Sequence, residues 1–472
     1  MAVAIPSARF VGREGEFVRL AELIDAVAAG TPRTLLLTGA SGLGASRFLD
    51  EASARIARLP EPALVLRASA SAARRGCPYE PIAMALWPAL LGCSDGDLEA
   101  VVGPAGEVVA RLLPGLGPRL RSLGLVPDQP RRLEPERRQV RVFEAVLGVL
   151  ARLGERRPIL LVVEDVHRAD RATLGALAFL ARVSRPRRVG LVATYEVGAV
   201  TADHPLHETL RAMADGPLPP TAVELAPLGR SELAQLIEAI EGERPTASVL
   251  LLVAERSGGN PLVAEELLMA RRELSTASLT GSFEQLVVAR LARRSSACRR
   301  LLQLVAAAGH PVTRAELAAI DAVAFADGAA ARRSGTARRA AERRTAERRS
   351  TQGLSQELRA ALEEAFATGE LVERAELGVT VDVDAAPTGA TAPADAPADR
   401  PSASEAASLL DLRHERIRRA VMADLLPDVR GRLRAAVAAA GVGGPAHAIG
   451  HWRAANRPLE ARAAALLAAA EA

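Results

Sequence analysis

A glycine-rich stretch, Gly-Ala-Ser-Gly-Leu-Gly-Ala-Ser, begins at Gly39 and ends with a hydroxyl side chain at Ser46. In a phosphate-binding loop of the Walker A type, glycines let backbone N–H groups turn toward the phosphates, a lysine reaches the β- and γ-phosphates, and a serine or threonine binds Mg²⁺. Gly42 and Gly44 are the other glycines of this pattern, but Ala45 occupies the position of the lysine. The stretch therefore predicts a phosphate-binding loop that lacks its main positive charge.

An acidic pair, Glu164 and Asp165, follows the continuous apolar run 158–163. Carboxylates at the C-terminal end of a buried strand lie where open α/β sheets bind their ligands. In this Walker B pattern Glu164 would hold Mg²⁺ together with Ser46, and Asp165 would polarise the attacking water. The alternative is that the acidic pair only caps the next helix.

The elements around these residues predict an α/β P-loop core. Residues 33–38 are typical of a short buried strand before the loop, and 47–52 open a helix whose N-terminus would face the phosphates. A third strand, 189–195, ends at Glu196. Apolar strands alternate with amphipathic helices from residue 10 to about 215, which predicts a parallel sheet covered by helices on both faces.

Composition narrows the class of protein. The 472 residues carry a formal net charge of +4 and contain no lysine, so every strong positive charge is an arginine. Cys77, Cys93 and Cys298 lack the spacing of a metal site or a disulfide framework, which suits a reducing cytoplasm. No apolar run is long enough to span a bilayer, so we expect no membrane contact. The small net charge gives no reason to expect nucleic-acid binding.

Several motifs, taken together, resemble the ATPase core of large bacterial STAND regulators, a group that includes MalT-like and LuxR-type transcription factors and related signalling ATPases of the AAA+ kind. The matching core stretches are residues 10–14, 39–46, 164–170, 193–195 and 257–267. Beyond the core, residues 290–309 and 412–427 are similar to the two ends of the winged-helix domain of that group. Residues 451–467 resemble the first helices of its helical-repeat region.

The resemblance implies an ATP or ADP site with Mg²⁺. Phe10 to Glu14 would border the adenine, Pro261 would touch the base from a helical lid, and the strand end at Thr194 would face the γ-phosphate. His414 resembles the histidine with which distantly related NOD-like receptors reach the β-phosphate. The residues expected to bind nucleotide are Phe10, Val11, Gly12, Arg13, Gly39, Gly42, Gly44, Ala45, Ser46, Arg47, Thr194, Pro261 and His414.

The chain departs from the family pattern at three positions. Ala45 replaces the lysine, Glu196 replaces an arginine that faces the γ-phosphate, and Glu164 replaces the usual aspartate. A charge-assisted hydrogen bond to phosphate contributes about 1.5 to 3 kcal/mol. Losing two such cations weakens ATP binding by about two to four orders of magnitude. We therefore expect weakened nucleotide binding and little or no hydrolysis, with Glu164 and Asp165 as vestigial or weak catalytic groups.

The resemblance also implies a domain order. We expect a P-loop core over residues 1–215, a helical lid over 216–278, a winged-helix domain over 279–440 with disordered insertions near 325–353 and 378–408, and the start of a helical-repeat (TPR-like) region over 441–472.

The resemblance implies a regulatory switch that is either gated by nucleotide or held in one state by a bound nucleotide. Protein partners would bind its winged-helix and helical-repeat surfaces. Nucleotide-dependent self-association is part of this expectation, and nucleic acid enters only through an output domain downstream. Two alternatives stay open. One is an active ATPase that signals by hydrolysis, and the other is a nucleotide-free scaffold that has kept the fold and lost the ligand.

Overall fold

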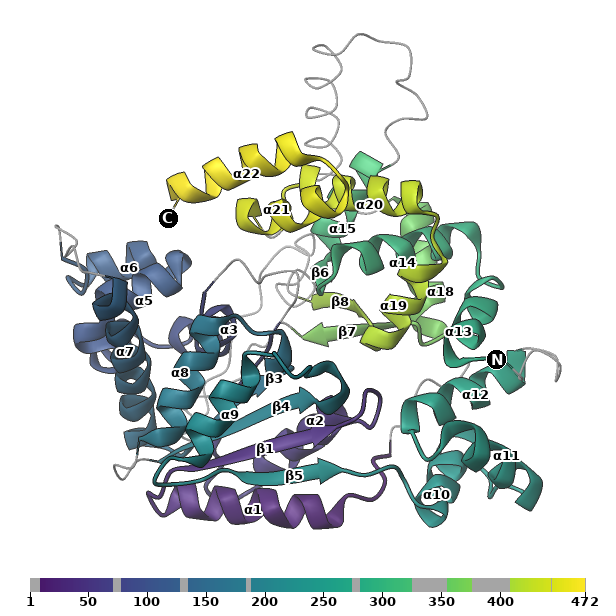
Figure 1. The fold of residues 1–472 in the computed structure, drawn as a ribbon, viewed down its shortest axis with the longest axis horizontal. Helices are drawn as coiled ribbons and strands as arrows, with labels where there is room; N and C mark the ends of the chain where they lie inside the picture. Colours follow the sequence, from purple (N-terminus) through teal and green to yellow (C-terminus); the bar gives the residue numbers. More distant parts are fainter. Residues whose placement is uncertain are drawn as a thin grey trace, which may run out of the picture. The chain divides into compact units, whose positions relative to one another are not determined.

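The computed structural model divides the chain into two compact units, Pro6–Leu279 and Thr280–Ala472 (Figure 1). The expected insertions near 325–353 and 378–408 fall almost entirely outside the residues that the structure describes. The described residues are 9–70, 78–127, 135–183, 188–273, 281–324, 355–375, 408–442 and 444–471.

A five-stranded sheet forms the centre of the first unit, in the order β2-β3-β4-β1-β5, and every neighbouring pair is parallel. This confirms the predicted α/β P-loop core. The strands are β1 (Arg33–Gly39), β2 (Leu64–Ser69), β3 (Ile159–Glu164), β4 (Val189–Glu196) and β5 (Thr221–Leu225).

The sheet contains two more strands than the apolar runs of the sequence predicted. The strands expected at 33–38, 158–163 and 189–195 correspond to β1, β3 and β4. The edge strands β2 and β5 are additional, and β5 pairs with β1 beyond the domain boundary expected near residue 215. That boundary therefore moves past β5, and the lid begins with α10 (Arg230–Glu241).

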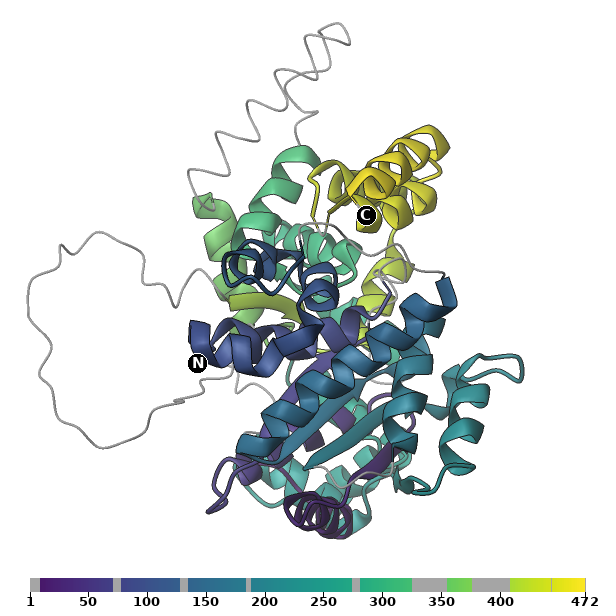
Figure 2. The same cartoon turned by 90° about the vertical axis from the view of Figure 1, so that its left-hand side faces the viewer.

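Helices cover both faces of the sheet, as Figure 1 and the turned view in Figure 2 show. Successive residues of a strand point to opposite faces. Leu160 packs with residues of α1 and α2 in one core cluster, while Leu161 lines a cavity on the other face with Leu147 of α7 and Leu180 of α8. The helices before the lid are α1 (Glu14–Ala28), α2 (Ala45–Ile56), α3 (Glu80–Leu91), α4 (Asp95–Val102), α5 (Gly106–Leu112), α6 (Gly117–Ser122), α7 (Pro135–Arg156), α8 (Arg171–Arg182) and α9 (Leu206–Ala214).

Three helices form the lid, here defined as α10, α11 (Ala247–Ser257) and α12 (Pro261–Glu273). They have a core of their own, in which Leu233 and Ile237 of α10 pack with Leu268 of α12. The helix starts agree with local chemistry, because the Thr246 hydroxyl accepts a hydrogen bond from the backbone N–H of Val249. Such an N-cap satisfies a backbone donor that the helix itself leaves without a partner.

The second unit combines helices with a small antiparallel sheet in the order β6-β8-β7. It contains α13 (Phe283–Leu291), α14 (Ser296–Ala308), β6 (Val312–Thr313), α15 (Arg314–Ala324), α18 (Gln356–Ala367), β7 (Leu371–Ala375), β8 (Ser408–Leu412), α19 (Glu415–Asp424), α20 (Pro427–Ala439), α21 (Gly444–Ala454) and α22 (Pro458–Glu471).

A cluster of three buried histidines lies in the second unit. The ring centroid of His447 is 4.5 Å from that of His310 and 4.6 Å from that of His451. His447 and His451 lie one turn apart on α21, and His310 precedes β6. Burial is the main cause that lowers the pKa of His451, to about 3, and His447 and Arg434 add to it. The ring of His451 is therefore neutral at physiological pH.

Candidate nucleotide site

The glycine-rich loop connects β1 to α2 in the predicted place. Gly42 and Gly44 have φ of 89° and 93°, in the left-handed region where a side chain is strained. The helix α2 begins at Ala45 directly after Gly44, so the first N–H groups of the helix belong to the loop. A helix N-terminus of this kind attracts an anion through its backbone donors and its dipole. The loop thus has the backbone features of a phosphate site.

Ser46 and Glu164 lie together, as the sequence predicted, but they bond directly to each other. The Ser46 hydroxyl donates a hydrogen bond of 2.6 Å to Oε2 of Glu164. Glu164 ends β3 and is 6% exposed. The two groups expected to share Mg²⁺ therefore satisfy one another.

Arg67, which the sequence analysis did not single out, holds the other side of Glu164. Its Nε donates to Oε1 of Glu164 over 2.7 Å, and its Nη2 donates to the backbone carbonyl of Ser46 over 3.1 Å. Nη1 makes an ion pair with Asp50 of α2. Burial alone would lower the pKa of Arg67, but Glu164 and Asp50 outweigh it and raise the pKa above the ordinary value. The guanidinium is a fixed positive charge at the end of the sheet.

This arrangement does not fit Mg²⁺. Both carboxylate oxygens of Glu164 accept hydrogen bonds, one from Ser46 and one from Arg67. A divalent ion bound to both oxygens of Glu164 would compete with both donors, and one bound to a single oxygen would compete with Ser46 or Arg67. It would also stand beside the guanidinium, and charges of +2 and +1 at 4 Å repel by about 8 kcal/mol at an effective dielectric constant of 20. The expected Mg²⁺ pair is thus brought together, but in an arrangement that opposes the ion.

Thr194 and Asp165 meet at the neighbouring strand ends. Asp165 has φ of 55° and precedes the short turn Val166–Arg168. Its backbone N–H donates to Oγ1 of Thr194 over 3.0 Å, and Thr194 is 3% exposed. The side chain of Thr194 therefore positions the acidic turn from inside the protein, and the nucleotide contact expected for Thr194 stays a prediction.

Glu196 lies at the same sheet edge as the loop, because it is paired in register with Gly39. Its backbone N–H donates to Nδ1 of the buried His167 over 3.3 Å. His167 thus fixes the end of β4 from the turn that follows β3. The placement supports the expectation that residue 196 faces the loop region, where this chain carries a negative charge.

The lid is bonded directly to the loop. Nδ2 of Asn260 donates to the carbonyl of Ser41 over 2.9 Å, and the N–H of Leu262 donates to the carbonyl of Gly42 over 3.4 Å. A side chain at Gly42 would come within 2.8 Å of Asn260, which explains why the close contact requires glycine. Pro261, expected near the base, begins α12 between these two contacts. Asn260 therefore joins the lid to the phosphate loop, a role that was not assigned from the sequence.

An ionic contact between α2 and α12 adds to the hydrogen bonds between loop and lid. Nη1 of Arg47, expected in the nucleotide site, lies 4.0 Å from Oε1 of Glu265. Arg47 is the third residue of α2, and Glu265 is buried on α12. Arg47 of the loop helix α2 therefore makes an ionic contact with Glu265 of the lid.

The segment before α1 also contacts the loop. Nη2 of Arg13 donates to the carbonyl of Leu43 over 3.2 Å, and Arg13 is 7% exposed. Phe10 packs edge-on against Phe17, with ring centroids 5.5 Å apart. Val11 is buried, and Gly12 has φ of 70° with Glu232 of the lid directly above it. The structure thus brings the expected adenine segment to both the loop and the lid.

His414 lies in the second unit. Its ring Nδ1 accepts a hydrogen bond from the backbone N–H of Arg416 over 3.0 Å, so it caps the start of α19. This contact accounts for a histidine at that position within its own unit. The proposed β-phosphate role of His414 stays a prediction.

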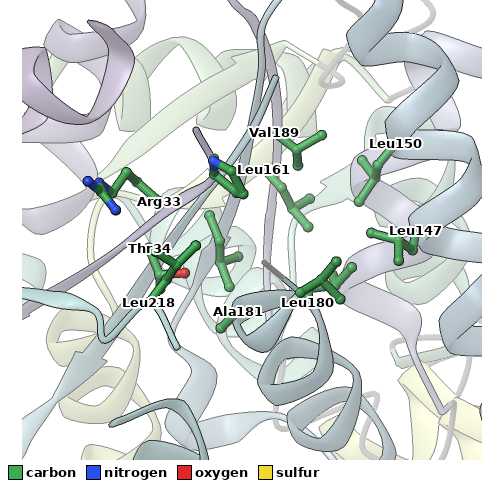
Figure 3. Close-up of a pocket in the computed structure, with 13 residues that line it drawn as sticks. Arg33, Thr34, Leu147, Leu150, Leu161, Leu180, Ala181, Val189 and Leu218 are labelled. Atoms are coloured by element: carbon green, nitrogen blue, oxygen red, sulfur yellow. The ribbon is translucent and has the colours of Figure 1, made fainter. Parts of the chain in front are cut away.

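Figure 3 shows a cavity beside the central sheet, away from the C-terminal strand ends that carry the loop. It is lined by residues at the amino ends of β1 and β4, among them Arg33 and Val189, together with apolar side chains of α7 and α8. The space open to the centres of water molecules is about 30 Å³, which suits about two waters. This cavity is an apolar packing gap and does not replace the loop as the candidate site.

Within the parts of the chain that the structure describes, no helix is long and apolar enough to cross a membrane. Among the same residues, no group of three or more histidine, cysteine, aspartate or glutamate side chains is arranged to hold a metal ion.

Comparison with known proteins gives a match within the first unit. Residues 9–192 match the family model described as the AAA ATPase domain. A protein of Rhizobium meliloti that is described as uncharacterised is 28% identical over 326 residues, which are 64% of this chain and 30% of that protein. This chain thus spans about a third of the length of that relative.

Solved structures similar to the chain include two from archaea. A STAND protein with a tetratricopeptide repeat sensor from Pyrococcus horikoshii aligns with a TM-score of 0.49 at 10% identity, over 97% of this chain and 49% of that one. The Walker-type ATPase of Pyrococcus abyssi aligns with a TM-score of 0.34 at 14% identity, over 89% of this chain and 98% of that one.

Proposed function

We propose that the protein is a regulatory switch whose AAA ATPase domain binds ADP or ATP weakly and hydrolyses it little or not at all. The observation that carries this proposal is the combination of an intact glycine loop at a helix N-terminus with Ala45 in place of lysine. Backbone donors for phosphate are kept, while the side-chain cation that reaches the β- and γ-phosphates is missing.

Three features oppose hydrolysis. Ala45 supplies no charge to the transferred phosphoryl group, and Glu196 adds a negative charge at the strand end beside the loop. Glu164 is held by Arg67 and Ser46. Cations that stabilise the transition state of phosphoryl transfer are worth a factor of roughly 10³ or more in rate. Turnover should therefore suffer far more than binding.

The contacts between loop and lid supply a route for signalling. A phosphate that reorders the loop acts on the carbonyls of Ser41 and Gly42, and these accept hydrogen bonds from Asn260 and Leu262 of the lid. Nucleotide would thus bias the position of α12 through bonds made by the loop itself. A switch of this kind needs binding and no hydrolysis.

The remaining parts of the proposal follow from the resemblance to STAND regulators. The three-stranded sheet and the helices of the second unit support the winged-helix assignment, and α21 and α22 support the start of a helical repeat. Protein partners would bind these surfaces, with nucleotide-dependent self-association as one consequence. A cytoplasmic location and an output domain downstream belong to the same proposal.

The scaffold alternative has its own support, because side-chain and backbone contacts of the chain itself bond the loop to the lid. The nucleotide content of the purified chain separates the alternatives. The protein is denatured by heat, and the released nucleotides are identified by chromatography. Bound ADP or ATP supports the switch. A nucleotide-free protein that also shows no calorimetric binding at millimolar ADP supports the scaffold.

Steady-state ATPase activity tests the claim on hydrolysis. We expect a rate at background with Mg²⁺ present, unchanged in Glu164→Gln and Asp165→Asn. A Mg²⁺-dependent rate that either substitution abolishes would instead favour the active signalling ATPase.

A further inference from the structure

The side chain of Arg67 contacts both residues from which the sequence predicted a metal site. Its Nε lies 2.7 Å from Oε1 of Glu164, and its Nη2 lies 3.1 Å from the carbonyl oxygen of Ser46. The third contact, to Asp50, ties the guanidinium to α2. Arg67 of β2 therefore links β3 to the first turns of α2, next to the glycine-rich loop.

Burial makes this charge a fixed part of the site. The side chains of Arg67 and Glu164 are 11% and 8% exposed, whereas that of Asp50 is 69% exposed. A buried carboxylate needs a cation beside it, because an isolated buried charge costs several kcal/mol. In this protein the cation that balances Glu164 comes from the chain itself.

We propose that Arg67 takes the place of the divalent cation, so that the phosphate site excludes Mg²⁺ and receives its ligand without a metal. Arg67 bonds to the carboxylate that would hold the ion and to the backbone carbonyl of Ser46, the residue whose hydroxyl would be the other ligand. A permanent guanidinium is suited to this role, since it stays charged at every physiological pH and offers several N–H donors to oxygen.

The proposal has two parts with different foundations. Exclusion of the cation follows from the contacts of Arg67 and needs no nucleotide. The second part, binding of ADP or ATP as the metal-free anion, rests on the proposed function. A nucleotide bound in this way gains nothing from Mg²⁺, because the metal would hold the phosphates without a protein carboxylate to receive it.

Titration with Mn²⁺, followed by its electron paramagnetic resonance signal in the absence of nucleotide, tests the first part on the full chain. We expect the wild-type protein and Glu164→Gln to bind Mn²⁺ equally weakly. Arg67→Met should create a Mn²⁺ site at least tenfold tighter, and the double variant Arg67→Met/Glu164→Gln should lose it. A wild-type Mn²⁺ site that Glu164→Gln removes would overturn the proposal, as would a folded Arg67→Met protein without a new site.

Three further variants complete this test. Arg58→Met removes the same charge from an exposed position after α2 and should leave Mn²⁺ binding unchanged. If circular dichroism shows that Arg67→Met is unfolded, Arg67→Gln replaces it with a polar side chain of similar reach. Arg67→Lys keeps the charge and should still exclude Mn²⁺. A Lys variant that binds Mn²⁺ as tightly as the Met or Gln variant would contradict exclusion by charge.

Calorimetry with ADP, in EDTA and in Mg²⁺, tests the second part. The wild-type affinity should agree within about twofold between the two buffers, and Arg67→Met should bind ADP at least tenfold more tightly with Mg²⁺ than without. A tenfold gain of the wild type from Mg²⁺ would overturn the proposal. If the wild type binds ADP in neither buffer, the proposed nucleotide function fails, and the Mn²⁺ titration still decides whether Arg67 excludes the cation.

Discussion

A buried glutamate is held by arginine in each of the two units, and the surroundings of the two clusters differ. In the first unit Arg67 pairs with Glu164 at the C-terminal edge of a parallel sheet, beside a glycine loop and the exposed Asp50. In the second unit Glu370 lies 3.2 Å from Arg290 and 2.9 Å from Arg294, with side chains that are all less than 10% exposed. Burial is the main cause that raises the pKa of Glu370, although both arginines favour its charged form.

The difference separates an ion pair that shapes a site from one that joins packed elements. Glu370 is the residue before β7. It bonds to Arg290 of α13 and to Arg294 in the turn after α13, so all of these contacts lie within one unit. The Arg67 cluster adjoins backbone donors that can bind an anion, so its charge balance affects a ligand as well as the fold. The same pair of residue types therefore serves stability in one unit and ligand choice in the other.

The largest effect is expected for Glu370→Gln. Removing its charge leaves Arg290 and Arg294 buried without their carboxylate, which should lower the free energy of unfolding by about 3 to 5 kcal/mol. Urea denaturation measures this change. Glu373→Gln, at an exposed pair with Arg314, should change stability by less than about 0.5 kcal/mol. A similar loss for both variants would mean that burial does not set the energy of the pair.

Ala45→Lys should restore a cation to the first unit. If the loop keeps its shape, ATP should bind more tightly by about 1.5 to 3 kcal/mol, or roughly tenfold to a hundredfold, as calorimetry can measure. Adding Glu196→Arg should strengthen ATP more than ADP, and the two changes should couple because both act on the same phosphate. A double variant that binds no nucleotide at millimolar concentration would replace the switch with the scaffold.

Acid should weaken the second unit through its histidine cluster. The pKa of His451 is about 3 in the folded protein and about 6.5 in an unfolded chain, so the unfolded state binds more protons between these values. Stability is then fully present above pH 6.5 and falls as the pH drops below it, by about 2 kcal/mol at pH 5. Chemical denaturation at pH 7 and 5 measures the loss. His451→Phe should reduce this difference, and an unchanged pH dependence would exclude His451 as its source.

Asn260→Ala should have the smallest effect. It removes one hydrogen bond between lid and loop, together with the bonds that Oδ1 of Asn260 accepts from the backbone N–H groups of Leu262 and Val263. We expect a loss of about 1 to 2 kcal/mol, visible as faster hydrogen exchange at the start of α12. Glu255→Ala, at an exposed position on α11, should leave the exchange unchanged. Equal exchange in the wild type and Asn260→Ala would show that the lid is held to the loop by its other contacts.

Local sequence patterns predicted the parts of the site that lie within a few residues of one another. The loop from Gly39 to Ser46 is recognised by its glycines, and β1 and β3 are continuous apolar runs because both faces of a central strand are buried. The edge strands were missed for the same physical reason. β2 contains Arg67 in an alternating pattern, and β5 alternates buried with exposed residues, so neither is a continuous apolar run.

Only the tertiary structure revealed which polar groups meet. Ser46, Arg67 and Glu164 come from three separate elements, and Asn260, the residue before α12, reaches the loop from more than 200 residues away in the chain. Parallel pairing brings the ends of these strands to one edge, and burial then forces each charge to find a partner there. The sequence alone could determine that a lysine is absent from the loop. The identity of the cation beside Glu164 depended on the packing of β2 against β3.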